Sequence, residues 1–417
     1  MTQTTTDAAQ LARQLADRRC GVVRPRLSVG CAVYRSDPDG LTRALESVLA
    51  QTFDDFELVI CDNSPDTATR DVIEPIARRD ERVSYFYNDL NIGAYPSFWR
   101  AMQLGAGPYF KWVADDDVLA PTYFQQCVDA LDADETIALC YPRTTVRWGD
   151  TGEEEVGAGG EIEAMDESPV ERFKQVLAQR WAAHGFYGVM RSSVLRRLHP
   201  LSHDCCRLAD VLLMAEVALY GRIRLLDDVL FEYTEKRQPW DDRETLNANH
   251  YRICFPNNPT RGITLPNVKF AAELFEAVRH SDLEPVDKAE LYHVIPQIVR
   301  AKLGGYWQQE IDRAIALVGQ NMFLHGWGDA AERHPKIVDS HRGVVYRFHA
   351  SEMLRRFEEV LLVWPDYPSP GLHSARAICM VLMNRIPEAV ATLRLEQHLH
   401  PDFAVARELL TKLGQTP

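Results

Sequence analysis

The feature that most constrains this fold is an alternation of two hydrophobic periods in the first third of the chain. Compact apolar runs rich in small and β-branched residues, typical of buried strands, lie at 27–34, 56–64, 83–89 and 108–114. The stretches between them have apolar residues at helical intervals, at 41–53, 69–80 and 97–107. Strands that alternate with helices in this way build a mostly parallel sheet. We therefore expect an α/β fold, a mostly parallel sheet with helices on its faces.

The pattern changes along the rest of the chain. A helix is expected at 123–134, a strand at 137–146 and a polar Gly/Glu-rich loop at 149–163. Helices and strands continue to 240, whereas from about residue 259 the apolar spacing is helical. A chain of 417 residues is also too long for one ordinary core. These changes predict a helical arm at 1–24, an α/β domain at 25–258 and a C-terminal all-α domain at 259–417.

Composition and charge exclude several classes of protein. A net charge of −14 argues against a broad surface for nucleic acid or for an anionic membrane. The longest apolar run, 211–220, is interrupted by Glu216, and the N-terminus lacks the apolar core of a secretory signal. We therefore expect no transmembrane segment and a cytoplasmic location. The nine cysteines include no CxxC spacing, which argues against a zinc ribbon.

Acidic residues follow the predicted strands. FKWVADDDVLAP (110–121) places Asp115–Asp117, here called the acidic triplet, directly after an apolar run, and two earlier runs lead to Tyr34 and Asp62. The carboxyl ends of parallel strands share one edge of a sheet, where ligands bind. Adjacent carboxylates repel one another, so the triplet predicts a bound divalent cation. The alternative is a solvated acidic loop that caps the following helix.

In their order, these motifs resemble the family 2 glycosyltransferases with the GT-A fold. The resemblance implies a nucleotide-sugar-binding, Rossmann-like mixed sheet with helices on both faces. LSVGCAVYR is similar to the family's first strand, with Tyr34 kept while Ala32 and Arg35 depart from the pattern. ESVLAQTFDDFELVICDNSPD (46–66) is similar to the helix and strand that lead to its nucleotide-contacting Asp. NIGAYPSFWRAMQLGAGPYFKWVADDD (91–117) is similar to the stretch that ends in its Asp-x-Asp motif. Trp99 stands there in place of the usual Asn.

The resemblance implies an inverting, metal-dependent glycosyltransferase that moves a sugar from a nucleotide-sugar donor to an acceptor hydroxyl. Asp117 would be the main ligand of Mn²⁺ or Mg²⁺, and Asp62 would contact the nucleobase that Tyr34 lines. Two structural alternatives stay open, a helix-capping role for Asp62 and a core-edge role for Tyr34. The implied nucleotide-sugar residues are Ala32, Tyr34, Asp62, Asp115 and Asp116, and the implied metal ligands are Asp117 and Asp115.

RLADVLLMAEVALYGRI (207–223) resembles the family segment that carries the catalytic base, which implies that Asp210 removes the acceptor proton. Asp204 is the competing candidate, and an N-cap role for Asp210 is the structural alternative. HGFYGVMRSSVLRRL (184–198) resembles the wall on the acceptor side. The candidates for binding the leaving diphosphate are Arg237, Arg243 and His250, although solvated surface cations are equally compatible with the sequence.

The segment 368–414 resembles about one tetratricopeptide repeat, with a turn near Asn384. Fewer than three repeats seldom stand alone, so we expect these helices to pack on neighbouring helices or to form a homodimer. A plain helical bundle is the alternative.

Two classes of function follow from these features. The first is a transferase acting on a saccharide in surface-polysaccharide or glycoconjugate synthesis, with a peptide, protein or small metabolite as alternative acceptor. The second is a non-catalytic helical-repeat scaffold whose other domain only holds a nucleotide. The presence together of Asp62, the acidic triplet and Asp210 favours the enzyme.

Overall fold

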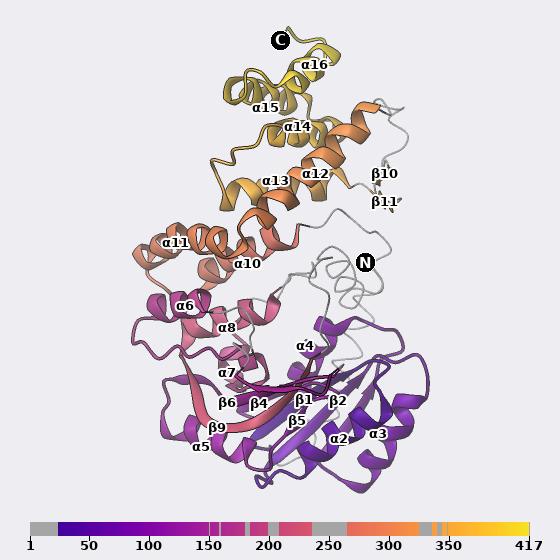
Figure 1. Ribbon diagram of the computed structural model, residues 1–417, viewed down its shortest axis with the longest axis vertical. Helices are drawn as coiled ribbons and strands as arrows, with labels where there is room; N and C mark the ends of the chain where they lie inside the picture. Colours follow the sequence, from indigo (N-terminus) through magenta and orange to yellow (C-terminus); the bar gives the residue numbers. More distant parts are fainter. Residues whose placement is uncertain are drawn as a thin grey trace. The chain divides into compact units, whose positions relative to one another are not determined.

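The computed structural model describes residues 24–149, 151–157, 160–179, 184–198, 208–235, 265–324, 336–339, 344–347 and 349–416 (Figure 1). The chain divides into two compact units, Met1–Asn257 with His280–Asp287, and Asn258–Arg279 with Lys288–Pro417. The functional boundary placed at 258 stays a prediction, and the helix expected within 1–24 lies outside the described residues. None of the described helices has the length and apolar character that crossing a membrane requires.

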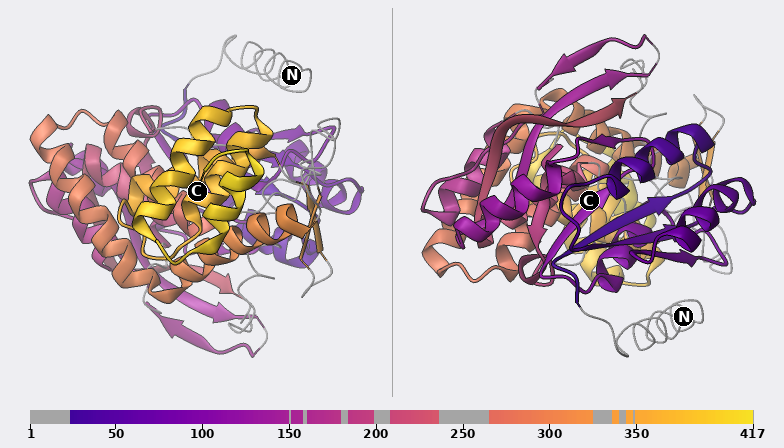
Figure 2. Two further views of the ribbon diagram at one scale, coloured as in Figure 1. Left: turned by 90° about the horizontal axis from the view of Figure 1, so that it is seen from above. Right: turned by 90° about the horizontal axis from the view of Figure 1, so that it is seen from below.

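The first unit is built around a nine-stranded mixed sheet (Figure 1). Its strands are β1 (Leu27–Val33), β2 (Phe56–Asp62), β3 (Val83–Tyr87), β4 (Tyr109–Val113), β5 (Val118–Leu119), β6 (Ile137–Trp148), β7 (Glu154–Val156), β8 (Val189–Arg191) and β9 (Arg222–Glu235). They lie in the order β3-β2-β1-β4-β8-β6-β9-β5, and β7 pairs with β6. The long strands β6 and β9, together with β7, extend past the rest of the sheet (Figure 2).

Strand direction divides this sheet into two parts. The four strands β3, β2, β1 and β4 are parallel, as the alternating sequence pattern predicts. β8 is antiparallel to both β4 and β6, and β5 is antiparallel to β9. The mixed sheet is confirmed, and its parallel part is the part that carries the acidic motifs.

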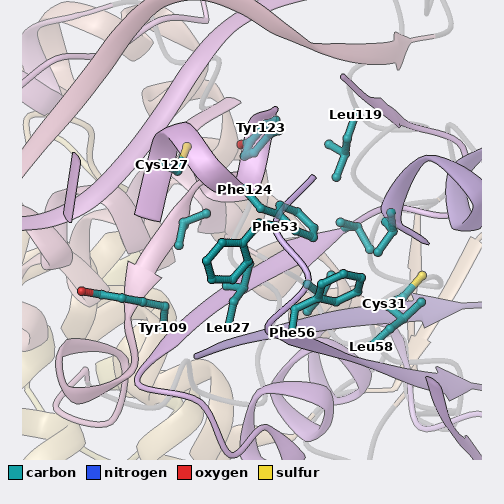
Figure 3. Packing of buried hydrophobic residues seen from close by; sticks show 14 of the residues in the cluster. Leu27, Cys31, Phe53, Phe56, Leu58, Tyr109, Leu119, Tyr123, Phe124 and Cys127 are labelled. Atoms are coloured by element: carbon teal, nitrogen blue, oxygen red, sulfur yellow. The ribbon is translucent and has the colours of Figure 1, made fainter. Parts of the chain in front are cut away.

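Helices cover both faces of the sheet. Along β2, Leu58 and Ile60 join a core cluster with residues of α2, α3 and α5, whereas Val59 and Cys61 pack with residues of α4. Figure 3 shows the larger cluster, in which the rings of Phe56 and Phe124 meet edge to face at 5.3 Å. The helical elements of this unit are α2 (Pro38–Leu49), α3 (Ala68–Arg79), α4 (Ala94–Leu104), α5 (Tyr123–Ala133), α6 (Pro169–Ala178), the 3₁₀ helix η1 (His184–Tyr187), α7 (Ser192–Leu195) and α8 (Ala209–Tyr220).

Helix α2 begins three residues before the helical spacing predicts, inside the polar stretch RSDPDG. Asp37 is its N-cap, because its Oδ2 accepts a hydrogen bond of 2.8 Å from the Gly40 amide. Pro38 is the first helical residue, where its missing N–H leaves no bond unmade. A cap followed by proline therefore extends the helix toward β1.

The second unit is helical, with one added β-ladder. Its helices are α10 (Pro266–His280), α11 (Pro285–Leu303), α12 (Gly305–Leu324), α13 (Ala350–Val363), α14 (Leu372–Leu382), α15 (Ile386–Leu399) and α16 (Ala404–Lys412). Strands β10 (Lys336–Asp339) and β11 (Val344–Arg347) form an antiparallel pair that the spacing did not predict. The turn near Asn384 is confirmed, and this residue has a φ of 59° between α14 and α15. The tetratricopeptide assignment and the homodimer stay predictions.

A buried carboxylate joins two of these helices. Glu396 of α15 is fully buried and accepts hydrogen bonds from the amides of Gly371, at 3.0 Å, and Ser374, at 2.9 Å. Both amides lie at the start of α14, where a helix leaves N–H groups unpaired and favours a negative charge. Glu396 thus caps α14 from a neighbouring helix.

We predict that Asp37→Ala lowers the free energy of unfolding by about 1 kcal/mol, because the Gly40 amide loses its acceptor. Asp37→Asn is the matched control, since an Asn side chain caps helices about equally well. Urea denaturation of both variants measures the difference. Equal stability of the two would show that the carboxylate contributes no cap.

Candidate functional site

The parallel strands bring the predicted site residues to one edge of the sheet. Val33, the last residue of β1, is paired with Asp62, the last residue of β2. On the other side of β1, Cys31 is paired with Val113, the last residue of β4, and the acidic triplet follows two residues later. Ala32 and Tyr34 flank the end of β1 at the same edge. The edge predicted from the sequence is therefore formed.

The members of the triplet differ in burial. Asp115 is half-buried and accepts a hydrogen bond through Oδ2 from the Ser36 hydroxyl, in the loop after β1. Burial raises the pKa of Asp115, and the Ser36 bond partly opposes that rise. Asp116 is exposed, and its backbone carbonyl accepts a bond of 3.1 Å from the Thr234 hydroxyl. The loop after β1 and strand β9 thus hold the triplet from two sides.

Asp117 is the member whose carboxylate is least satisfied. It is 3% exposed, and its Oδ1 accepts a hydrogen bond of 3.0 Å from the Thr234 amide. Its Oδ2 is buried and meets no hydrogen-bond donor among the described residues. Burial, followed by the charge of Asp116, raises the pKa of Asp117 well above its ordinary value. An unsatisfied buried acceptor of this kind costs stability unless a ligand occupies it.

Asp62 is fully buried and both of its carboxylate oxygens have partners. Oδ1 accepts from the Ser64 amide at 2.7 Å and Oδ2 accepts from the Tyr85 hydroxyl at 2.7 Å. The capping alternative fails, because the N-cap of the following helix α3 is Thr67. Burial, followed by the Asp62 bond, raises the pKa of the Tyr85 phenol. The assignment of Asp62 to the nucleobase stays a prediction.

A buried polar network supports the ends of β2 and β3. The Asn88 amide donates to Asn63 Oδ1 at 2.7 Å, and the Arg100 guanidinium donates to Asn88 Oδ1. Asn63 in turn donates to the carbonyl of Gly93 at 3.2 Å. Gly93 has a φ of 95°, a conformation that favours glycine. These asparagines therefore hold the loop before α4 in place.

Tyr34 is not a core-edge aromatic, since its side chain is 43% exposed. The guanidinium of Arg35 lies 5.5 Å from the centroid of its ring. Arg35 itself has a φ of 52°, and its amide donates to the Ser64 hydroxyl at 2.9 Å. The exposed ring is available at the same edge as the triplet.

The stretch 184–198, which resembles the family's wall on the acceptor side, meets two aromatic residues of β9 that sequence reasoning missed. Tyr187, in the turn η1, packs its ring against Phe231 at 5.6 Å and Tyr233 at 6.0 Å, both on β9. Burial raises the pKa of Tyr187 well above its ordinary value, and Tyr233, Asp117, Asp116 and Asp210 raise it further. Tyr187 is thus within electrostatic range of both the triplet and the proposed base.

Asp210 lies in the first turn of α8, two residues after Leu208, the N-cap residue, which has a φ of 69°. Asp210 is therefore not the N-cap, and its Oδ1 accepts from the Val211 amide at 2.9 Å. A carboxylate in the first helical turn is favoured in its charged form by the helix dipole. The other sequence candidates, Asp204, Arg237, Arg243 and His250, lie outside the described residues.

The residues present fit a hard divalent cation. The described residues contain no preformed group of three or more His, Cys, Asp or Glu side chains that could hold a metal. However, Mg²⁺ is usually held by one or two carboxylates together with substrate phosphates. The buried, unpartnered Oδ2 of Asp117 offers one such ligand.

His184 begins the turn η1 and is buried with its ring 5.2 Å from that of Tyr233. Its Nδ1 has no hydrogen-bond partner among the described residues. Burial lowers the pKa of His184 from 6.5 to about 4. The folded chain therefore holds this imidazole in its neutral form at pH 7.

This lowered pKa predicts a pH dependence of stability. The unfolded chain binds the proton more readily than the folded chain, so the contribution is complete above pH 6.5 and is lost as the pH falls toward 4. The loss should reach at most about 3 kcal/mol. We expect His184→Gln to flatten this part of the stability profile, measured by urea denaturation between these pH values. Parallel profiles for the two proteins would contradict the neutral buried imidazole.

Comparisons with known proteins relate part of the first unit to glycosyltransferases. Residues 28–198 match the family model Glycosyl transferase family 2. The chain is 24% identical over 119 residues to an uncharacterized glycosyltransferase of Methanocaldococcus jannaschii, covering 28% of this chain and 41% of the relative. It is 33% identical over 79 residues to the putative colanic acid biosynthesis glycosyl transferase WcaA of Escherichia coli, covering 19% and 28%. It is 29% identical over 94 residues to the putative teichuronic acid biosynthesis glycosyltransferase TuaG of Bacillus subtilis, covering 22% and 37%.

The chain thus spans less than half the length of each of these relatives. A crystal structure of S. aureus TarS 1–349 in complex with UDP-GlcNAc superposes with a TM-score of 0.49 at 15% sequence identity, over 88% of this chain and 91% of that chain. The family match begins in β1 and ends just after α7, so it contains the acidic triplet and the turn η1. The chain therefore carries a glycosyl transferase family 2 domain.

Proposed function

We propose that the chain is an inverting, metal-dependent glycosyltransferase that uses a nucleotide-sugar donor. The observation that carries this proposal is the buried, unpartnered Oδ2 of Asp117 at the edge where the family-matched strands end. A folded protein keeps such a costly group where a ligand satisfies it. The neighbouring carboxylates of Asp115 and Asp116 add to the same negative charge.

Asp117 and Asp115 would hold Mn²⁺ or Mg²⁺. When bound, a divalent cation neutralises the charge of the donor diphosphate and stabilises it as a leaving group. Ser36 orients Asp115 through its hydroxyl, and the Thr234 amide orients Asp117. Asp116 and Tyr34 are exposed at this edge, where we assign them to the donor sugar and the nucleobase. We assign Asp62 and Ala32 to the nucleotide side.

Asp210 is the proposed general base. In a single displacement, its carboxylate takes the proton of the acceptor hydroxyl while the acceptor oxygen bonds to the anomeric carbon of the donor. The bond from that carbon to the diphosphate oxygen breaks with its electron pair, and the nucleoside diphosphate leaves. Attack opposite the leaving group inverts the anomeric centre, so no enzyme nucleophile is required. Asp210 lies in the first turn of α8, where a helix dipole favours a negative charge.

For the acceptor, we propose a saccharide of a surface polysaccharide or related glycoconjugate. Two of the relatives are named for colanic acid and teichuronic acid biosynthesis, which supports this class. The partly buried rings of Tyr187 and Tyr233 beside the triplet suit the apolar faces of a sugar. We assign the second unit to assembly or acceptor docking.

A donor screen tests the proposed function. UDP-, GDP- and dTDP-sugars are added to the full chain, with Mn²⁺ or with EDTA, while melting temperature and sugar release are measured. A true donor should stabilise the fold by about 3 kcal/mol at about 100 times its Kd. Stabilisation and hydrolysis that need Mn²⁺ are expected for at least one donor. The absence of both for every donor would favour the scaffold alternative.

Asp117→Asn should separate metal binding from folding. The amide keeps an acceptor for the Thr234 N–H but removes a buried, partly unpaired charge, so the metal-free melting temperature should stay equal or rise. The stabilisation by donor with Mn²⁺ should be lost. Calorimetry with EDTA and with Mn²⁺ measures both effects, and Asp132→Asn, at an exposed ion pair with Arg26, is the control. Retained Mn²⁺-dependent stabilisation would remove Asp117 from the metal site.

Asp210→Asn tests the base. Because Asp210 is not the N-cap, the amide should leave the melting temperature nearly unchanged. Transfer should fall by about 10²- to 10⁴-fold, since an amide accepts no proton at neutral pH. Donor binding should be retained, and Asp204→Asn is run in parallel. A fully active Asp210→Asn with an inactive Asp204→Asn would move the base to Asp204.

A further inference from the structure

Lys111 is a lysine buried in the centre of the sheet. It lies in the middle of β4 and is fully buried, although lysine is almost never found so without a charged partner. No described acidic side chain lies within salt-bridge distance of its amino group. Burial lowers the pKa of Lys111 to about 7. Burying this amino group costs free energy of folding, so packing alone does not explain a lysine at this position.

Its amino group is held by the turn η1 and by two rings. Nζ donates a hydrogen bond to the carbonyl of Tyr187, the last residue of that turn. It also lies 4.1 Å from the ring centroid of Tyr123 and 5.3 Å from that of Phe231. Tyr123, at the start of α5 (Figure 3), donates its hydroxyl to the same carbonyl at 2.9 Å. Two buried donors from separate elements therefore converge on one backbone oxygen.

The turn that they hold is pressed between β6 and α8. A Cβ at Gly188 would come within 3.0 Å of the Cys140 carbonyl on β6. A Cβ at Gly185 would come within 2.5 Å of the Met214 side chain on α8, the helix that begins beside Asp210. The turn therefore has little freedom, and its position depends on both neighbours.

Contacts through β9 connect the turn with the acidic triplet. The Tyr187 ring packs against Tyr233, and the next residue, Thr234, binds Asp117 through its amide and Asp116 through its hydroxyl. Phe231, which contacts the Lys111 amino group, lies on the same strand. Lys111 thus contacts both η1 and β9, the strand whose Thr234 amide orients Asp117.

We propose that Lys111 is a positioning residue for the transfer reaction: it holds the carbonyl of Tyr187, and so fixes the turn between the acidic triplet and Asp210. The residue reaches no substrate, because it is buried beneath the sheet edge. Its role in transfer rests on the proposed function. The role in holding the turn does not, because every contact lies within the chain.

Hydrogen–deuterium exchange of the full chain tests the proposal without any donor. Lys111→Met removes the donor and keeps an apolar stem, so exchange in the segment 184–191 should rise by about tenfold or more. Lys111→Gln keeps an N–H donor and should return this exchange to within about threefold of the natural chain. Rescue by Gln is not expected if the lysine only fills space.

Two further variants keep the test decisive. Ser28→Ala removes a buried hydroxyl that donates to Glu57 near the start of β1, at the opposite end of the strand from the triplet. Its exchange profile shows what general destabilisation of the sheet looks like. Tyr123→Phe keeps the ring and loses the second donor, so it should raise exchange in 184–191 by a smaller factor, even if Lys111→Met proves insoluble. Unchanged exchange there, or a rise spread evenly over β1 and β2 as in Ser28→Ala, would overturn the proposal.

Transfer kinetics distinguish this inference from the proposed function. With a donor from the screen, Lys111→Met should lower kcat by about tenfold or more and change the donor KM by less than about threefold, because η1 lies near Asp117 and Asp210, whereas we assign the nucleobase to Tyr34 and Asp62. A chain with no donor at all would refute the proposed function while leaving the exchange result standing. If Lys111→Met raises exchange in 184–191 but keeps a normal kcat, Lys111 holds the turn without any role in transfer, and that part of the proposal is refuted.

Discussion

The parallel pairing of β1 with β2 and β4 is the constraint on which the candidate site depends. Because β1 lies between the other two strands, the ends of all three meet, and the loops that follow them must share a small region. Ser36 after β1 therefore reaches Asp115 after β4, and the amide of Asn63 after β2 donates to the carbonyl of Val33 at the end of β1 at 2.9 Å. A slip of two residues in either pairing would separate these partners.

The polar groups at this edge fall into satisfied and unsatisfied sets. The satisfied set is Asp62, Asn63 and Asn88. Their side chains form hydrogen bonds with other groups of the protein, which makes the loops rigid. Asp117 keeps one oxygen without a partner among the described residues. The satisfied set builds a frame, and the unsatisfied carboxylate is the group for which a ligand has most to offer. Binding is therefore expected at a buried group whose unmet hydrogen bond costs stability.

Much of the fold was predictable, because short apolar runs and helical spacing report directly on burial. The parallel strands, the triplet at the end of β4 and the helical second unit follow from such local patterns. The position of β8 between β4 and β6 did not, since antiparallel pairing of a three-residue strand leaves no periodic signal. The alternative N-cap role for Asp210 was wrong, because Leu208 occupies that place with a positive φ, which the local sequence does not signal. Lys111 was missed because lysine in a strand ordinarily points to solvent.

The bond that orients Asp117 comes from a backbone amide on β9, not from a side chain. Every residue except proline supplies the same donor. Evolution can therefore change the side chain at position 234 and keep the orientation of Asp117, as long as the strand keeps its register. A comparison of related sequences would show no coupled partner for this carboxylate, and its geometry would be inherited through the path of the chain.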